Sequence, residues 1–148
     1  MGSEMCIRDR SWPGAGTARR TLKPGHAFSR IHCDDIALAV GAALRQSLAP
    51  GIRIFHLVDD EPAESALVVE EAARLLGLPP PPAVPYEQAA ASMSSMGRSF
   101  WAENRRVSNA RTKAELGIAW RYPTYREGLA AILGEERPMH GRVETFRS

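Results

Sequence analysis

Residue types that could do chemistry gather first at residues 30–37, which read Arg-Ile-His-Cys-Asp-Asp-Ile-Ala. This order predicts a strand end, a polar turn and a helix start. Ligands of open α/β sheets bind at the carboxyl ends of strands, so Arg30 and His32 are candidate ligand contacts. A guanidinium beside a buried helix start needs a carboxylate, a phosphate or water. His32 fits a structural imidazole as well as a ligand contact.

Two groups of adjacent acidic residues could do chemistry. Either Asp34 or Asp35 can accept hydrogen bonds from the first turn of a helix, so we expect a helix cap there. Asp59, Asp60 and Glu61 follow a strand-like run. A metal site or an acid/base pair is one interpretation of this second group. A turn before a helix explains it better, because adjacent side chains point in different directions.

The densest basic stretch of the chain runs from residue 98 to residue 111, with Phe100 and Trp101 inside it. A polyanion-binding face is one interpretation of this pattern. We favour a solvated or internally paired surface. Asn109 is expected to cap a helix that stops at Gly117. The arginines concerned are Arg98, Arg105, Arg106 and Arg111.

Composition limits the class of protein. The 148 residues are 44% hydrophobic and 24% charged, which is typical of one soluble globular domain. A formal charge of +2, spread along the chain, gives no reason to expect nucleic acid as a partner. No run approaches the roughly 20 apolar residues of a membrane span, and no signal pattern begins the chain, so we expect a cytoplasmic setting. The two cysteines and four histidines lack zinc-site spacing, so no metal is expected.

Periodicity predicts the elements that must position these residues. A helix buried on several sides is predicted after residue 35, because large apolar residues recur at helical spacing with small residues between them. Residues 52–58 are apolar and β-rich, which predicts an interior parallel strand. A second helix should end at Leu76, with Gly77 as its stop. The apolar residues of the first helix are Ile36, Val40, Leu44 and Leu48.

Weaker patterns follow in the second half of the chain. Residues 86–96 are mildly helical, and the aromatic pair at residues 100–101 should anchor them on the core. Thr124 and Glu127 fit a capping box that opens the last helix. That helix should stop at Gly134, before a polar tail at residues 135–148.

The amino-terminal residues differ from the rest. Residues 1–10 resemble translated adapter read-through and are excluded from fold reasoning as a non-native segment. Residues 11–25 read as an extended lead-in. The partial glycine motif at residues 14–19 fails as a dinucleotide loop, because Arg19 replaces the third glycine and no strand precedes it.

Several short motifs, taken in order, resemble the substrate-binding half of extended and atypical short-chain dehydrogenase/reductase proteins, the group that includes NAD-dependent epimerase/dehydratase-like proteins. The resemblance covers residues 26–134. It implies an α/β fold, the C-terminal part of a Rossmann-like fold with few strands and several packed helices. The motifs are His32 to Asp35, the strand Ile52 to Leu57, Asp59 to Pro62, Leu76-Gly77, Leu116-Gly117, Tyr122-Pro123 and Glu127-Gly128-Leu129.

Departures from the family pattern limit what carries over. Family members pair a tyrosine with a lysine four residues later, which lowers the pKa of the phenol while a nicotinamide transfers hydride. In this chain the three positions four residues after a tyrosine hold Ala90, Arg126 and Leu129. Sugar-nucleotide epimerases also resemble this segment, with an arginine where this chain has Phe28. A nucleotide-sugar substrate is therefore not favoured.

The resemblance implies a fragment of an NAD(P)-dependent epimerase/dehydratase-like oxidoreductase that is inactive by itself. The intact parent would use NAD or NADP and a small-molecule substrate, whereas this chain should bind neither dinucleotide tightly. The alternative is a small non-catalytic binding module whose basic face takes an acidic partner. Apolar edges left exposed would favour self-association. The candidate substrate-binding residues are Arg30, His32, Arg105 and Asn109.

Overall fold

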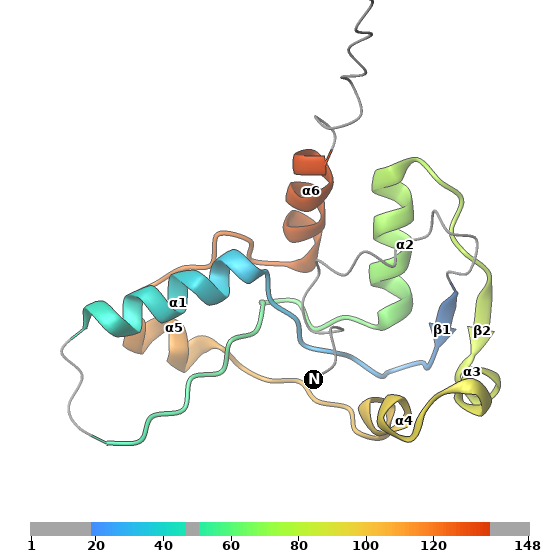
Figure 1. Cartoon of the computed structure of the whole chain (residues 1–148), viewed down its shortest axis with the longest axis horizontal. Coiled ribbons are helices and arrows are strands. Elements are labelled where there is room, and N and C mark those ends of the chain that lie inside the picture. Colours follow the sequence, from blue (N-terminus) through green and yellow to red (C-terminus); the bar gives the residue numbers. More distant parts are fainter. Residues whose placement is uncertain (1–18, 47–50, 137–148) are drawn as a thin grey trace, which may run out of the picture.

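A computed structural model describes residues 19–46 and 51–136 (Figure 1). Those residues form six helices and a small parallel sheet, which confirms the predicted α/β class. None of these helices is long and apolar enough to cross a lipid bilayer. The elements are β1 (Arg20–Leu22), α1 (Cys33–Arg45), α2 (Ser65–Leu76), β2 (Ala83–Pro85), α3 (Tyr86–Ser92), α4 (Ser95–Ala102), α5 (Ala110–Leu116) and α6 (Tyr125–Glu136).

Several sequence predictions lie outside the described residues. These are the non-native segment at residues 1–10, most of the lead-in, residues 14–18 of the glycine motif, Leu48, and the tail beyond residue 136.

Two apolar clusters hold the helices together. In the first, α2 packs against α6, which stands beside it in Figure 1. In the second, α1 packs against the end of α5 and the segment that follows it. The first cluster is built from Ala63, Val68, Ala72, Tyr125, Leu129 and Ile132, and the second from Ile31, Ala39, Ala42, Leu116 and Trp120.

The sheet pairs β1 with β2 in parallel, with Arg20 opposite Ala83. Below it, α4 contributes Trp101, whose ring stacks on His26 with the centroids 5.3 Å apart. Trp101 is 8% exposed and its neighbour Phe100 is 36% exposed. The predicted aromatic anchor is therefore Trp101, and the expectation for Phe100 was wrong, because the two side chains leave the helix in different directions.

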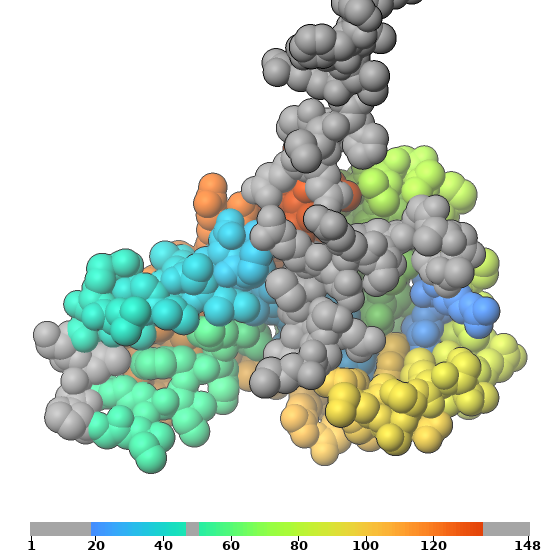
Figure 2. Space-filling model, in the orientation of Figure 1, coloured from blue at the N-terminus to red at the C-terminus, as the bar shows by residue number. Residues whose placement is uncertain are grey.

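The start of α1 lies where the sequence predicts it. Of the predicted apolar residues, Ile36 packs on the second apolar cluster, but Val40 and Leu44 do not. The buried residues are Asp35, Ala39 and Ala42, whereas Val40 and Leu44 are exposed. The small alanines allow the end of α5 to approach closely, whereas Val40 and Leu44 lie on other faces of the helix. Figure 2 shows α1 at the surface of one lobe, above the segment at residues 51–58.

The predicted interior strand at residues 52–58 was wrong. The segment runs without regular secondary structure, and Ile52 and Ile54 are exposed. Phe55 and Leu57 still pack on the second apolar cluster. A β-strand requires a neighbouring strand to share its hydrogen bonds, and the described residues supply none here.

The helix ends predicted at Gly77 and Gly117 are confirmed. Gly77 and Gly117 take left-handed conformations with φ of 70° and 62°, and their N–H groups close α2 and α5 as predicted. The Thr124 N–H donates to the Glu127 carboxylate at 3.0 Å, in agreement with a capping box. The expected stop at Gly134 was wrong, since α6 continues to Glu136. A glycine weakens a helix without ending it.

Candidate functional site

Two extended segments meet in front of α1 and α2. Phe28 and Ala63 exchange two backbone hydrogen bonds, at 3.0 and 3.1 Å. Nearby, the Asp59 N–H donates to the Arg30 carbonyl oxygen at 2.5 Å. The Arg30 guanidinium donates to the carbonyl oxygens of Phe28 and Ala63, at 3.2 and 3.1 Å. Arg30 and Asp59, which are 29 positions apart in the sequence, therefore lie side by side.

The carboxyl group of Asp59 is buried, and neither of its oxygens has a hydrogen-bond partner among the described residues. Burial raises its pKa from 3.8 to about 7, against the charge of Arg30, which acts in the opposite direction. Near neutral pH this group can therefore give or take a proton. Buried carboxyl groups with such values are typical of functional sites.

Tyr125 supplies a second buried polar group in this region. It is the first residue of α6, and its hydroxyl has no hydrogen-bond partner among the described residues. Burial raises the pKa of Tyr125, whereas the charges of Arg126 and Arg30 lower it. Arg30 thus acts electrostatically on both Asp59 and Tyr125.

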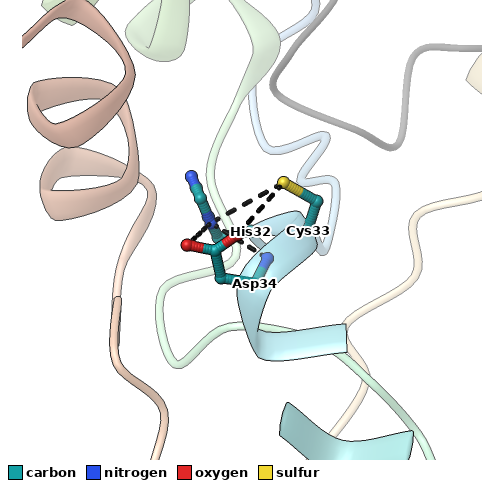
Figure 3. Close-up of side chains that lie close together, drawn as sticks. All are labelled: His32, Cys33 and Asp34. Atoms are coloured by element: carbon teal, nitrogen blue, oxygen red, sulfur yellow. Dashed lines mark hydrogen bonds and ion pairs between the residues drawn. The ribbon is translucent and has the colours of Figure 1, made fainter. Parts of the chain in front are cut away.

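His32 caps α1. Its Nδ1 accepts a hydrogen bond from the Asp34 N–H at 3.2 Å, and its ring lies against that of Tyr122 with the centroids 4.2 Å apart (Figure 3). The predicted capping role of Asp34 or Asp35 was therefore wrong. Asp35 is fully buried and accepts the N–H groups of Arg121 and Tyr122, at 2.6 and 3.0 Å.

His32, Cys33 and Asp34 place three metal-ligand atoms within 4.8 Å of one another (Figure 3). The set is a poor metal site, because Nδ1 of His32 already caps the helix and a metal on that atom would remove the cap. Three consecutive residues also give little control of ligand geometry. We assign His32 a structural role in this arrangement.

Asn109 is buried and faces the turn that carries Asp59. Its Nδ2 donates to the Val58 carbonyl oxygen at 2.8 Å and to Oδ1 of Asp60 at 2.6 Å. Burial favours a higher pKa for Asp60, but the hydrogen bonds from Lys113 and Asn109 outweigh it and hold the pKa below its usual value. Asn109 is the N-cap residue of α5, as predicted, but its side chain makes no capping hydrogen bond to that helix. Asn109 therefore positions the residues on both sides of Asp59.

Arg105 lies away from these groups. Its side chain is exposed and forms an ion pair with Glu103. Only its carbonyl oxygen approaches the first extended segment, where it accepts the Ser29 hydroxyl at 3.4 Å. Other arginines of the basic stretch are also paired internally: Arg111 contacts Glu115, and Arg98 donates to the Met93 carbonyl oxygen at 3.0 Å.

The structure thus brings Arg30 together with Asp59. Asn109 is linked to them because its side chain contacts Val58 and Asp60, the two neighbours of Asp59. It places His32 in a helix cap and Arg105 on the surface. Sequence reasoning assigned Asp59 to a turn and Tyr125 to an apolar stripe, and so missed both. An acidic residue directly after an apolar, strand-like run was the signal that could have identified Asp59.

Comparisons with known proteins agree with this description of the fold. No family model matches the chain. It is 34% identical over 101 residues to 3-diazoavenalumate denitrifying reductase of a Streptomyces species, an alignment that spans 68% of this chain and 32% of the reductase. The chain therefore spans about a third of the length of the curated relative that it matches.

Two solved structures have the same fold over most of the chain. A functionally unknown conserved protein from Silicibacter pomeroyi DSS is 45% identical with a TM-score of 0.75, covering 82% of this chain and 42% of its own. Human epimerase family protein SDR39U1, solved with NADPH, is 21% identical with a TM-score of 0.68, covering 81% and 40%. These findings show that the described fold is shared with part of the human epimerase family protein and with part of the Silicibacter pomeroyi protein.

Proposed function

We propose that this chain forms the substrate side of an NAD(P)-dependent epimerase/dehydratase-like oxidoreductase. The relationship to a reductase and the fold shared with a protein solved with NADPH support this assignment. The small-molecule substrate would be held by this chain, and the dinucleotide by protein outside it. The chain's own sequence lacks both a complete glycine loop and the tyrosine–lysine pair, so no cofactor contact is assigned to its residues.

The observation that carries the proposal is the adjacency of Arg30 and Asp59. Both follow extended segments that lead toward a helix, which is where open α/β folds bind ligands. The guanidinium of Arg30 suits a carbonyl, carboxylate or phosphate oxygen of the substrate. The carboxyl group of Asp59, with its pKa near 7, suits proton transfer to or from the substrate.

The other predicted site residues have different parts in this proposal. Asn109 and His32 act as positioning residues, because their side chains hold the turn around Asp59 and the start of α1. Arg105 would contact only a substrate that reaches the surface. The alternative of a basic binding module has less support, because three of its four arginines, Arg98, Arg105 and Arg111, are engaged with neighbouring groups.

A hybrid enzyme tests the proposal. The matched 101 residues of the Streptomyces reductase are replaced by the corresponding residues of this chain, and consumption of the diazo substrate is followed with NADH or NADPH supplied. We expect turnover that falls at least about tenfold on Asp59→Asn, a loss typical of removing a general acid or base. Glu87→Gln, at an exposed position of α3, is the matched control and should leave turnover unchanged.

Two outcomes would count against this function. A folded hybrid in which Asp59→Asn behaves like Glu87→Gln would remove Asp59 from the reaction. A folded hybrid that gives no turnover with either dinucleotide would contradict the assignment as a whole. Circular dichroism of each variant separates loss of activity from loss of fold.

A further inference from the structure

Three aromatic rings pack together beside Arg30, and we call His26, Phe28 and Trp101 the aromatic cluster. The rings of His26 and Trp101 stack with their centroids 5.3 Å apart, and Phe28 meets each of them edge-on, at 4.6 and 5.2 Å. The Arg30 guanidinium lies over the Phe28 ring, 5.5 Å from its centroid. A cation at this distance from an aromatic face is attracted to it. The cluster therefore touches one member of the Arg30–Asp59 pair.

The cluster joins α4 to the extended segment that leads from β1 to α1 (Figure 1). His26 is 4% exposed, and its ring nitrogens have no hydrogen-bond partner among the described residues, so ring contacts hold it. Asn104, which follows α4, fixes the backbone on both sides of His26. It accepts the Ala27 N–H at 2.9 Å and donates to the Gly25 carbonyl oxygen at 2.6 Å.

Phe28 is held from two directions. Its backbone exchanges two hydrogen bonds with Ala63, and its ring packs on Trp101. The guanidinium of Arg30 donates to the carbonyl oxygens of both Phe28 and Ala63 through one nitrogen, Nη1. Two hydrogen bonds from one nitrogen fix that atom but do not by themselves set the plane of the guanidinium. The Phe28 ring supplies a further contact, on the face of that plane.

We infer that Phe28 is a positioning residue that holds the Arg30 guanidinium beside Asp59, and that Trp101 of α4 keeps the Phe28 ring in place for this role. The geometry of Arg30 is a property of this chain by itself. The inference rests on the proposed function only in taking the Arg30–Asp59 pair to act on a substrate.

The carboxyl group of Asp59 reports where the charge of Arg30 lies. Burial raises the pKa of Asp59 to about 7, Arg30 lowers it and Glu61 raises it. Carbon-13 NMR of this carboxyl group across a pH titration of the full chain measures the pKa. We expect Arg30→Gln to raise it by about 1 or more, and Phe28→Leu to raise it by a large part of that amount. Phe28→Tyr keeps the ring and should leave the pKa near 7.

Ile132→Val is the matched control. It removes buried apolar volume from the first apolar cluster and no aromatic ring, so the pKa of Asp59 should not change. The inference is overturned if Phe28→Leu leaves this pKa unchanged. It is equally overturned if the pKa falls, because Phe28 would then only keep water away from Asp59. An unchanged pKa in Arg30→Gln would also overturn it.

Trp101→Leu and Trp101→Phe test the same inference from α4. The first removes the ring that supports Phe28 and should raise the pKa of Asp59, whereas the second keeps a ring and should not. These variants decide the matter if Phe28→Leu does not fold, which circular dichroism shows. Equal pKa values for the two Trp101 variants would remove Trp101 from this role.

Kinetics of the hybrid reductase separate this inference from the proposed function. Phe28→Leu should raise KM about tenfold or more, the loss of one hydrogen bond to a charged group, and change kcat less. A raised pKa of Asp59 with an unchanged KM would contradict the proposed function and leave the positioning role standing. A raised KM with an unchanged pKa would overturn the positioning role and leave the proposed function standing.

Discussion

Asn109 donates from its amide nitrogen to the carbonyl oxygen of Val58 at 2.8 Å, a contact between residues 51 positions apart. The same nitrogen reaches Oδ1 of Asp60, so one buried side chain holds the backbone before Asp59 and the carboxylate after it. The orientation of Asp59 thus depends on a residue from a distant part of the chain.

Asn109→Ala is expected to lower the free energy of unfolding by about 1–3 kcal/mol, because it leaves a buried carbonyl oxygen without its donor. Urea denaturation measures the change. Ser92→Ala is the control: its hydroxyl donates to Ala89 on the exposed surface, and its loss should cost less than about 0.5 kcal/mol. Equal shifts for the two variants would contradict the role of Asn109.

Asp35→Ala should also destabilise the protein, by about 2–3 kcal/mol or more. Its buried carboxylate accepts the N–H groups of Arg121 and Tyr122, and hydrogen bonds to a charged acceptor are stronger than neutral ones. Asp34→Ala is the matched control, because this half-exposed neighbour has ion-pair distances of 3.8 and 3.9 Å. Thermal unfolding of both variants should show a large loss for Asp35 and a small one for Asp34.

The raised pKa of Asp59 predicts how stability depends on pH. The folded protein holds the proton up to about pH 7, and the unfolded chain releases it near 3.8. Stability should therefore fall as the pH rises between these values, by up to about 1.4 kcal/mol per pH unit. Carboxylates with lowered pKa values, such as Asp60, change the stability only at pH values below this range. Urea midpoints at pH 5 and pH 7.5 should converge in Asp59→Asn, and an unchanged difference would contradict the prediction.

Trp101 and Phe100 are adjacent residues with different environments. Trp101→Ala removes a buried ring that contacts His26, Phe28 and Tyr86, and should cost about 3–5 kcal/mol. Phe100→Ala should cost less than about 1 kcal/mol, because much of its ring is already in water. Denaturation followed by far-ultraviolet circular dichroism compares them, and similar losses would refute the anchoring role of Trp101.

The chain by itself should bind neither NAD nor NADP tightly. Its sequence carries an incomplete glycine motif, and a dinucleotide needs close backbone approach to its pyrophosphate. Isothermal titration calorimetry with each dinucleotide checks this expectation. A low-micromolar Kd would contradict it and would move the cofactor site into this chain.

Signals confined to a few neighbouring residues were readable in the sequence. The stops at Gly77 and Gly117 and the Thr124–Glu127 box depend on backbone geometry within one turn, so the local residue types decide them. Gly134 shows the limit of this rule, because a glycine weakens a helix without ending it, and α6 continues to Glu136.

By itself, the sequence determined the α/β class, the start of α1, the helix ends at the two glycines and the likeness to epimerase-type proteins. Tertiary structure decided the roles of individual polar residues. Asp35 accepts hydrogen bonds from residues that are 86 and 87 positions away in the sequence, and Asn109 donates one to Asp60, which is 49 positions away. Residues 52–58 have the composition of a strand but not its hydrogen bonds. A strand forms only when a second segment lies beside it, and the composition of one segment does not determine that. Burial, which sets the pKa of Asp59, likewise arises only when distant parts of the chain pack together.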